Sequence, residues 1–276
     1  MYSKLIKKIE NKNIIIYYSN ELARNQNQFT LEEEKVLHLI FSKIKPFEKN
    51  PTTFKIEKLD LFEKLNLFGN SKYERYKKII QSLIGKTITK IEKMDSKSEL
   101  IGTIICDSEW FYKEAFFEIS LNSKFMPYIE ELKNHYTKLD FNSVVKFKAK
   151  HSLTLYKMFC SWTDENKKTN QRYITTKELK ELFNLSIDDY VYNGKFHRKL
   201  FEKYTIEKAI NEINKITNIN VIYKKNKKGN QVQNYEFTWI QKLKTHTDNY
   251  SKENTNKINS LNDKQTQMLL DNIDSN

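Results

Sequence analysis

A stretch in the last third of the chain gathers hydrogen-bond donors at one end of an expected helix. Residues 196–216 have helical spacing, and the apolar positions of one face are Ile206, Ala209, Ile210, Ile213 and Ile216. The start of the helix exposes His197, Arg198, Lys199 and Lys203, with Tyr204 nearby. A helix that enters the major groove of DNA needs donors there, and arginine can make two hydrogen bonds to guanine. Arg198 is therefore the candidate base reader, although an ordinary basic solvent face has the same composition.

The first half of the chain repeats this distribution in "SKYERYKKII", residues 71–80. Tyr76, Ile79, Ile80 and Leu83 are expected to face inward. The outer side carries Lys72, Tyr73, Arg75, Lys77 and Lys78. Two similar helices in equivalent places favour a nucleic-acid surface over a solvated basic face.

Two further groups of lysines lie next to expected strands. The turn "YKKNKKGNQ" carries Lys224, Lys225, Lys227 and Lys228, which suit contacts with the DNA backbone that position a protein without reading sequence. In "VVKFKAK", residues 144–150, lysines alternate with apolar residues as on one face of a strand. Lys148 and Lys150 there either contact phosphates or form a solvated strand edge.

Composition and charge agree with a polyanionic partner. The 276 residues carry a net charge of +13, and residues 241–276 are neutral because they hold five lysines and five acidic residues. The whole excess therefore belongs to residues 1–240, although a composition rich in Lys, Asn and Ile also follows from AT-rich coding sequence. Aromatic residues make up 13% of the chain, which indicates packed cores.

Motifs for catalysis, cofactors and metals are missing from the sequence. It contains no phosphate-binding G-x-x-x-x-G-K-[ST] loop, no H-x-H or H-E-x-x-H pair and no C-x-x-C. We therefore expect no cofactor, no metal and no enzymatic activity. Cys106 and Cys160 are expected to be buried thiols in a reducing cytoplasm. The apolar run 14–18 is too short to span a membrane, so no membrane partner is expected.

The elements that position these residues occur twice in the same order. Each half is expected to contain a helix, a strand with a short helix, a longer basic helix, and a β-hairpin. In the first half these are residues 29–44, 53–67, 71–93 and 100–122, followed by a short helix at 125–132. In the second half they are residues 152–163, 172–185, 196–216 and 219–240.

This order predicts an α+β protein with two tandem winged helix-turn-helix domains related by an internal repeat. The predicted domains are residues 1–143 and 144–240. Residues 241–276 are polar and are predicted to form a flexible, disordered tail, apart from one weak helix at 260–273.

Four stretches resemble the theta-type plasmid replication initiators, the iteron-binding Rep proteins. They are "YSNELARNQNQFTLEEEKVLHLIFSKI" (18–44), "YIEELKNHYTKLDFNSVVKFKAKHSLTLYKMFCSW" (128–162), "ITTKELKELFNL" (174–185) and "FEKYTIEKAINEINKITNINVIY" (201–223). The last is similar to the family's "F-K-R-x-V-L-x-x-A-I-x-E-I" recognition helix and the strand that follows it. Together the stretches span about 220 residues in the family's order.

The resemblance implies a protein that binds direct repeats in double-stranded origin DNA, opens AT-rich DNA and recruits host replication proteins. It also implies monomers at the origin and dimers that repress the protein's own promoter at an inverted repeat. Residues 197–199, Lys203 and Lys208 then fall in the second recognition helix, and residues 72–78 in the first. The chain departs from the family at Glu202, where a basic residue is usual, which would shift base contacts toward Arg198 and Lys199.

Two other functions fit the same residues. One is a sequence-specific transcription regulator without a replication role, which a lone palindrome beside the gene would favour over tandem direct repeats. The other is a DNA-nicking enzyme that uses a tyrosine, although the histidine pair that would hold its metal is missing. A nicking assay on a labelled strand separates the second from the rest.

Overall fold

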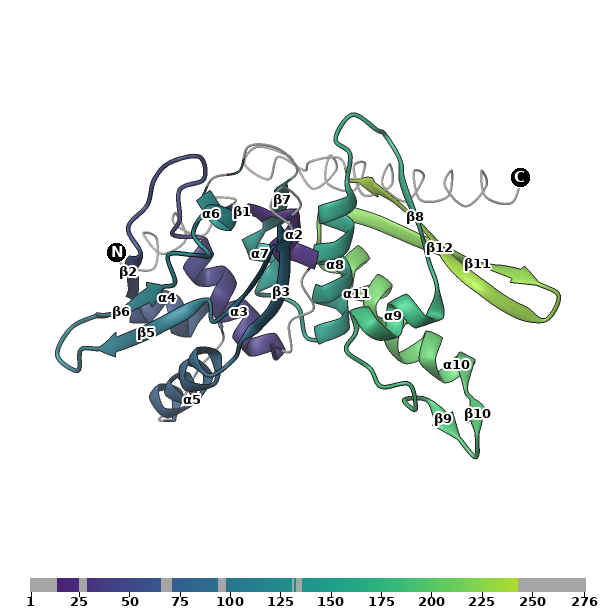
Figure 1. Ribbon diagram of the computed structural model, residues 1–276, viewed down its shortest axis with the longest axis horizontal. Helices are drawn as coiled ribbons and strands as arrows, with labels where there is room; N and C mark the ends of the chain where they lie inside the picture. The colour runs from purple at the N-terminus through teal and green to yellow at the C-terminus, as the bar shows by residue number, and fades with distance from the viewer. Residues whose placement is uncertain are drawn as a thin grey trace, which may run out of the picture. The chain divides into compact units, whose positions relative to one another are not determined.

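The computed structural model describes residues 14–24, 29–65, 71–93, 98–130, 132 and 136–242. The chain divides into two compact units, residues 1–146 and 147–276 (Figure 1). The sequence places the division between residues 143 and 144. The predicted tail begins in a strand, because β12 (Gln231–Gln241) includes Gln241, and residues 243–276 lie outside the described part.

The N-terminal unit contains the expected helices and a three-stranded sheet. Its main elements are α3 (Leu31–Phe41), β2 (Thr53–Glu57), α4 (Lys58–Lys64), α5 (Lys72–Ile84), β5 (Ile105–Trp110) and β6 (Phe116–Leu121). β6 pairs antiparallel with both β2 and β5, so the sheet order is β2-β6-β5. β5 and β6 form a hairpin that projects as a wing beside α5 (Figure 1).

The C-terminal unit repeats this topology. Its elements are α8 (Lys150–Trp162), β8 (Asn170–Ile174), α9 (Thr176–Leu182), α10 (Arg198–Phe201), η1 (Glu202–Glu207), α11 (Lys208–Ile216), β11 (Ile219–Lys228) and β12. The sheet order β8-β12-β11 matches β2-β6-β5 strand for strand, and all four pairings are antiparallel. The predicted pair of winged-helix domains is confirmed.

Local signals explain where the helices begin. Thr30 caps α3, and its side chain accepts a hydrogen bond from the Glu33 amide while the Glu33 side chain accepts one from the Thr30 amide. Thr175 and Glu178 form the same capping box at α9. These reciprocal bonds satisfy amides that an uncapped helix leaves unpaired. By contrast, no side chain caps α8 or α5.

Smaller elements surround this frame. In the N-terminal unit, β1 (Ile15–Ser19) pairs antiparallel with β7 (Tyr136–Asp140). The remaining elements of that unit are α2 (Asn20–Arg24), β3 (Ile88–Lys93), β4 (Ser98–Gly102), α6 (Pro127–Glu130) and α7 (Phe141–Val144). In the C-terminal unit, β9 (Val191–Tyr192) and β10 (Lys195–Phe196) form a small hairpin between α9 and α10. Sequence periodicity did not predict this hairpin, because each strand has only two residues.

Aromatic side chains fill both cores. In the N-terminal unit, Tyr76 of α5 packs against Trp110 and Phe117 of the wing, with ring centroids 5.0 and 4.7 Å apart. In the C-terminal unit, Phe159 of α8 packs against Phe237 and Trp239 of β12 at 5.6 and 5.0 Å. Burial of such rings supplies most of the stabilising free energy of a small domain.

The structure corrects the prediction of a strand at 144–150. Asp140 accepts a hydrogen bond from the Asn142 amide and starts α7, and residues 145–149 have no strand pairing. Phe147 is fully buried, while Lys146 and Lys148 remain exposed, so the alternation reflects burial without a strand.

Two further predictions are corrected. The helix expected from 196 begins at Arg198, because Phe196 belongs to β10. Of the two cysteines expected to be buried, Cys106 is exposed and Cys160 is half-buried. An irregularity in the β5–β6 pairing lies between Ile105 and Asp107, and this break in the strand's alternation accounts for the exposure of Cys106.

Candidate nucleic-acid interface

The helical segment 198–216 is the candidate recognition helix of the C-terminal unit. It runs through α10, η1 and α11, and its middle is a π-helix in which the Lys208 amide bonds the Lys203 carbonyl, five residues back. Of the predicted inner face, Ile206, Ala209, Ile210 and Ile213 are buried and Ile216 is half-buried. The predicted donors His197, Lys199, Lys203 and Lys208 are all exposed.

Arg198 lies differently from the other predicted donors. It is half-buried, and its Nη1 lies 3.4 Å from both Thr176 Oγ1 and Tyr235 Oη. The guanidinium carbon also lies 5.5 Å from the centre of the Phe196 ring. These contacts hold Arg198 between the start of α9 and strand β12, so its role as a base reader stays a prediction.

Glu202 is buried at the centre of this region, with 3% of its surface exposed. Its carboxylate accepts hydrogen bonds from Tyr235 Oη and from Lys225 Nζ, both at 3.0 Å. The side chain therefore faces the hairpin and not the solvent. The Glu202 carboxylate is therefore not part of the exposed donor surface, and the expected shift of base contacts toward Arg198 and Lys199 stays a prediction.

The wing formed by β11 and β12 contains lysines of two kinds. Lys224 Nζ lies 3.2 Å from the Glu236 carboxylate, and Lys225 pairs with Glu202; both glutamates are buried. Lys227 and Lys228 are exposed beside the turn at Gly229, which has the positive φ of 61° that glycine adopts easily. Within the described part of the chain, neither of these two lysines forms an ion pair.

The candidate recognition helix of the N-terminal unit is α5. Its predicted inner residues Tyr76, Ile79, Ile80 and Leu83 are buried, as expected. On the outer side, Arg75 pairs with Glu32 of α3, and Lys77 lies 3.0 Å from Glu74. Such exposed pairs are weak, and DNA phosphates compete for them easily.

The other predicted residues of α5 are Lys72, Tyr73 and Lys78. Lys72 Nζ lies 4.7 Å from the centre of the Phe62 ring, and Tyr73 packs edge-on against the same ring at 5.0 Å. Tyr73 keeps 41% of its surface exposed, and Lys78 is exposed as well. Lys78 has no ion-pair partner among the residues that the structure describes.

Lys58 anchors the wing of the N-terminal unit to α4. This lysine is buried, and its Nζ donates to the Phe111 carbonyl and, at 2.6 Å, to the Glu114 carbonyl. The same ammonium lies 4.4 Å from the centre of the Trp110 ring. Sequence patterning did not identify this residue, because a lysine at the start of a short helix normally indicates solvent exposure.

A third basic region lies at the start of α8. Lys148 is exposed and Lys150 is half-buried, while the His151 ring packs at a tilt against Phe183, with ring centroids 4.5 Å apart. Burial, followed by the charges of Lys150 and Lys208, lowers the pKa of His151 to about 4. Lys150 and Lys208, predicted from separate motifs, thus both act on one histidine.

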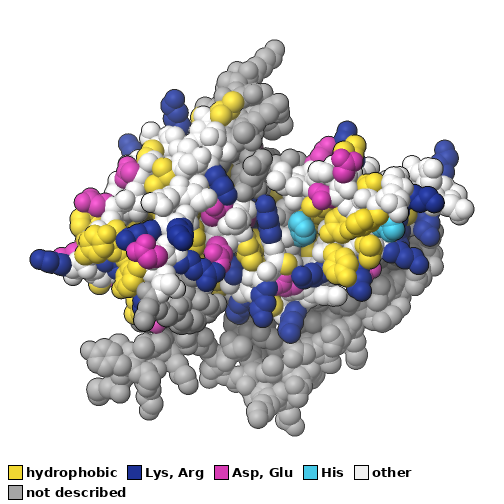
Figure 2. Space-filling model, turned by 90° about the horizontal axis from the view of Figure 1, so that it is seen from below, with side chains coloured by type: hydrophobic (Ala, Val, Ile, Leu, Met, Phe, Trp, Pro, Cys, Tyr) yellow, Lys and Arg dark blue, Asp and Glu magenta, His cyan; other side chains and the backbone are white. Residues whose placement is uncertain are grey.

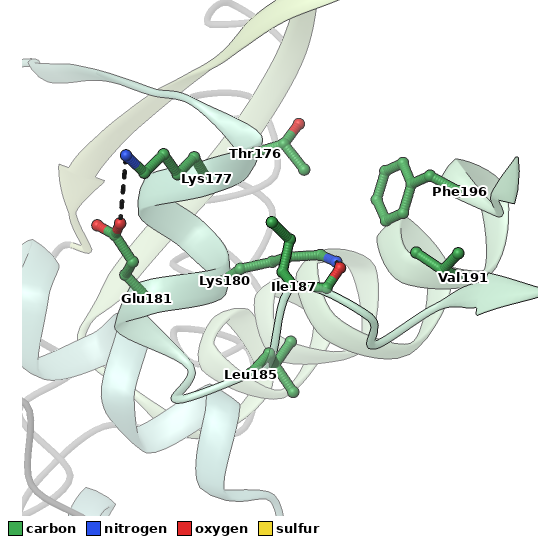
Figure 3. A pocket seen from close by; sticks show the side chains of 8 residues that line it. All are labelled: Thr176, Lys177, Lys180, Glu181, Leu185, Ile187, Val191 and Phe196. Atoms are coloured by element: carbon green, nitrogen blue, oxygen red, sulfur yellow. Dashed lines mark hydrogen bonds and ion pairs between the residues drawn. The ribbon is translucent and has the colours of Figure 1, made fainter. Parts of the chain in front are cut away.

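A pocket of about 450 Å³ opens between α9 and the β9–β10 hairpin of the C-terminal unit. Leu185, Ile187, Val191 and Phe196 line it, with α9 on one side and the β9–β10 hairpin on the other (Figure 3). Lys180 spans its floor and donates to the carbonyls of Ile187 and Asp189, both at 2.7 Å. Figure 2 shows hydrophobic side chains gathered near the hairpin with lysine or arginine side chains at their edge. The lining includes no pairing of a nucleophile with a base.

The described residues also bear on metal binding and membrane insertion. Within the described residues, no three His, Cys, Asp or Glu side chains come together in a way that could hold a metal ion. The helices of this same part of the chain are all too short or too polar to cross a membrane.

A solved structure shares this architecture. A crystal structure of the Pi initiator protein in complex with iteron DNA matches 85% of this chain and 100% of that one, with a TM-score of 0.70 and 23% identity. Domains 2 and 3 of RctB match with a TM-score of 0.45 and 8% identity over 82% of each chain. At this identity, the likeness to Pi establishes the fold. A comparison with curated protein sequences found no match.

Two family models match the chain in tandem. The model described as "Initiator Replication protein, WH1" matches residues 15–160, and the model described as "Initiator Rep protein, WH2" matches residues 175–239. Together they cover most of both units, while β8 of the C-terminal sheet lies between the two matches. This chain therefore belongs to the family of initiator replication (Rep) proteins.

Proposed function

We propose that this protein initiates plasmid replication by binding directly repeated sequences, iterons, in double-stranded origin DNA. The observation that supports this most is the duplicated unit, in which each copy combines an exposed basic helix with a wing beside it. Two such units in one chain can read two stretches of a single site. The Pi initiator, which has this fold, was crystallised with iteron DNA.

A footprint on DNA that flanks the gene tests this proposal directly. We expect protection over tandem direct repeats, with two protected grooves in each repeat. Binding should weaken steeply with salt, because neutralising about eight phosphates gives a log–log slope near −7. Protection of a single palindrome and of no direct repeat would instead favour a transcription regulator. The absence of any protected site would contradict DNA-based function.

Three further activities belong to the proposal: opening of AT-rich DNA, recruitment of host replication proteins, and repression of the protein's own promoter by a dimer. Permanganate probing of a supercoiled origin plasmid measures opening, and pull-down with purified bacterial helicase and initiator proteins measures recruitment. A promoter fusion with an intact or scrambled inverted repeat measures repression. If an intact repeat gives no repression at any protein level, repression of the promoter is not an activity of this protein.

We also propose that the protein acts in the cytoplasm without catalysing strand cleavage. The family match and the two DNA-reading units account for the chain without a catalytic site. Incubation of end-labelled single-stranded and supercoiled origin DNA with the protein and Mg²⁺ or Mn²⁺ tests this. A nicked product, or a covalent adduct between a tyrosine and DNA, would contradict it.

A further inference from the structure

The buried carboxylate of Glu202 joins the two parts of the C-terminal unit that carry the most donors. It belongs to the recognition helix, and it accepts hydrogen bonds from Lys225 of β11 and Tyr235 of β12. Tyr235 is fully buried and its hydroxyl also lies 3.4 Å from Arg198. One negative charge thus faces Lys225 directly and Arg198 through a tyrosine.

This arrangement resembles the way a phosphate would be bound. Lysine, arginine and a hydroxyl group are the groups that proteins direct at phosphate oxygens. Here two of these groups, Lys225 and Tyr235, donate to an internal carboxylate. Since Lys225 keeps 38% of its side chain exposed, its ammonium lies near the surface but has a partner already.

We propose that Glu202 is a specificity-determining residue, which holds Lys225 and Arg198 in place and lowers affinity for DNA of arbitrary sequence. The Lys225 ammonium remains paired when only phosphates are offered, because a phosphate must displace a buried carboxylate. Among the described residues, no buried carboxylate pairs with Lys227 or Lys228 at the wing tip, in contrast to Lys224 and Lys225. The protein thus limits its sequence-independent attraction while the hairpin stays fixed against the recognition helix.

The same pairing positions the wing. Non-specific affinity comes almost entirely from phosphate contacts, whereas specific affinity also needs donors held in the right geometry. Loss of the carboxylate would therefore strengthen non-specific binding and weaken specific binding. This inference rests on the proposed binding of DNA by the C-terminal unit.

The test is Glu202→Gln, which keeps the size of the side chain and an acceptor for Tyr235. Binding to a random duplex and to a repeat-containing duplex is measured at salt concentrations from about 50 to about 200 mM. For random DNA we expect a slope steeper by about 1 and a three- to tenfold gain in affinity, because one more phosphate contact forms. The ratio of specific to random affinity should fall.

Two comparisons identify the cause. The double variant Glu202→Gln with Lys225→Gln should return the random-DNA slope to the wild-type value. Glu207→Gln removes an equal charge from the same helical segment, where the carboxylate accepts from Tyr223 Oη at 3.2 Å and pairs with no lysine or arginine of the described residues, and should leave the slope unchanged. An equal gain in Glu207→Gln would overturn the inference, because it would show a general effect of charge.

A measurement on the wild-type protein covers the case in which Glu202→Gln does not fold. Lysine ammonium signals are followed by NMR while random DNA is added. We expect Lys227 and Lys228 to respond and Lys225 to stay unperturbed. A response of Lys225 equal to theirs would overturn the inference, and so would a folded Glu202→Gln variant with an unchanged slope. Failure of the wild-type protein to bind any DNA would instead contradict the proposed function.

Discussion

In each unit a buried charged side chain anchors the wing to a helix, and the two side chains have opposite charges. In the N-terminal unit, a buried lysine at the start of α4, Lys58, donates to carbonyls in the turn between β5 and β6. In the C-terminal unit, a buried glutamate in the recognition helix, Glu202, accepts from side chains of β11 and β12. The topology is therefore duplicated, whereas the polar contacts that fix each wing are not.

This difference has a functional consequence for the exposed donors. The Lys58 anchor joins one buried ammonium to backbone carbonyls, so it draws on no exposed basic side chain. The Glu202 anchor uses Lys225 itself and reaches Arg198 through Tyr235. One wing is thus held without an exposed basic side chain, and the other is held through Lys225.

The largest expected effect is on the N-terminal anchor. Lys58→Met keeps the apolar stem of the side chain but leaves the Phe111 and Glu114 carbonyls without their charged donor. We expect the free energy of unfolding to fall by about 3 kcal/mol, because hydrogen bonds to a charged group contribute more than neutral ones. Urea denaturation measures the loss, and hydrogen exchange of amides in 105–121 localises it.

Lys55→Met is the matched control for Lys58→Met. Lys55 is exposed on neighbouring β2 and lies 3.7 Å from Glu118, so its removal should change stability by less than about 1 kcal/mol. Equal losses in the two variants would show that burial of Lys58 contributes nothing, and the contrast between the two anchors would fail.

Substitutions of Arg198 and Lys78 compare the two candidate recognition helices directly. Arg198→Ala should weaken binding by roughly 1–3 kcal/mol and relax preference at one or two base pairs. Lys78→Ala should weaken binding to all sequences by a smaller amount, because a lone exposed lysine contacts phosphate without reading a base. Selection from a randomised repeat measures both. A loss with Arg198→Ala that is equal for every sequence would refute its assignment as a base reader.

The wing tips test how far each wing contributes to phosphate binding. Changing both Lys227 and Lys228 to Ala should make the salt slope shallower by about 2. Lys113 is the exposed lysine in the turn between β5 and β6, and Lys113→Ala should reduce the slope by about 1. Both variants should weaken binding to random and to repeat-containing DNA by the same factor. A change of sequence preference in either would show that its wing reads bases.

The smallest expected effect concerns the first helix of each unit. α3 begins with acidic residues and a capping box, whereas α8 begins with Lys150 and His151 and no side-chain cap. Because the pKa of His151 is lowered from 6.5 to about 4, the unfolded chain binds a proton first as the pH falls. Stability is therefore complete above pH 6.5 and decreases between about pH 6.5 and 4.

Thermal melts of the wild-type protein and His151→Gln across this pH window measure the effect. The wild-type melting temperature should fall more steeply toward pH 4 than that of the variant. Parallel curves for the two proteins would show that His151 is not the group responsible.

Many features followed from the sequence because they are local. The inward positions of α5 and α11 follow from helical periodicity, and the start of α3 follows from the Thr30–Glu33 capping box. The repeated order of elements predicted the two winged-helix domains, because the same local patterns recur in the same order in both halves. The same periodicity predicted the exposure of His197, Lys199, Lys203 and Lys78, whereas Arg198 is half-buried.

The polar contacts between distant segments depended on tertiary structure. Lys58 meets the wing across 53 and 56 residues, and Glu202 meets Lys225 and Tyr235 across 23 and 33. In sequence, these residues look like ordinary members of basic and acidic runs. Only folding decides which charges lose their water and must find a partner, because desolvation depends on packing and not on neighbours along the chain. The sequence thus determined the two units and their donors, and the tertiary structure decided which of the donors remain free.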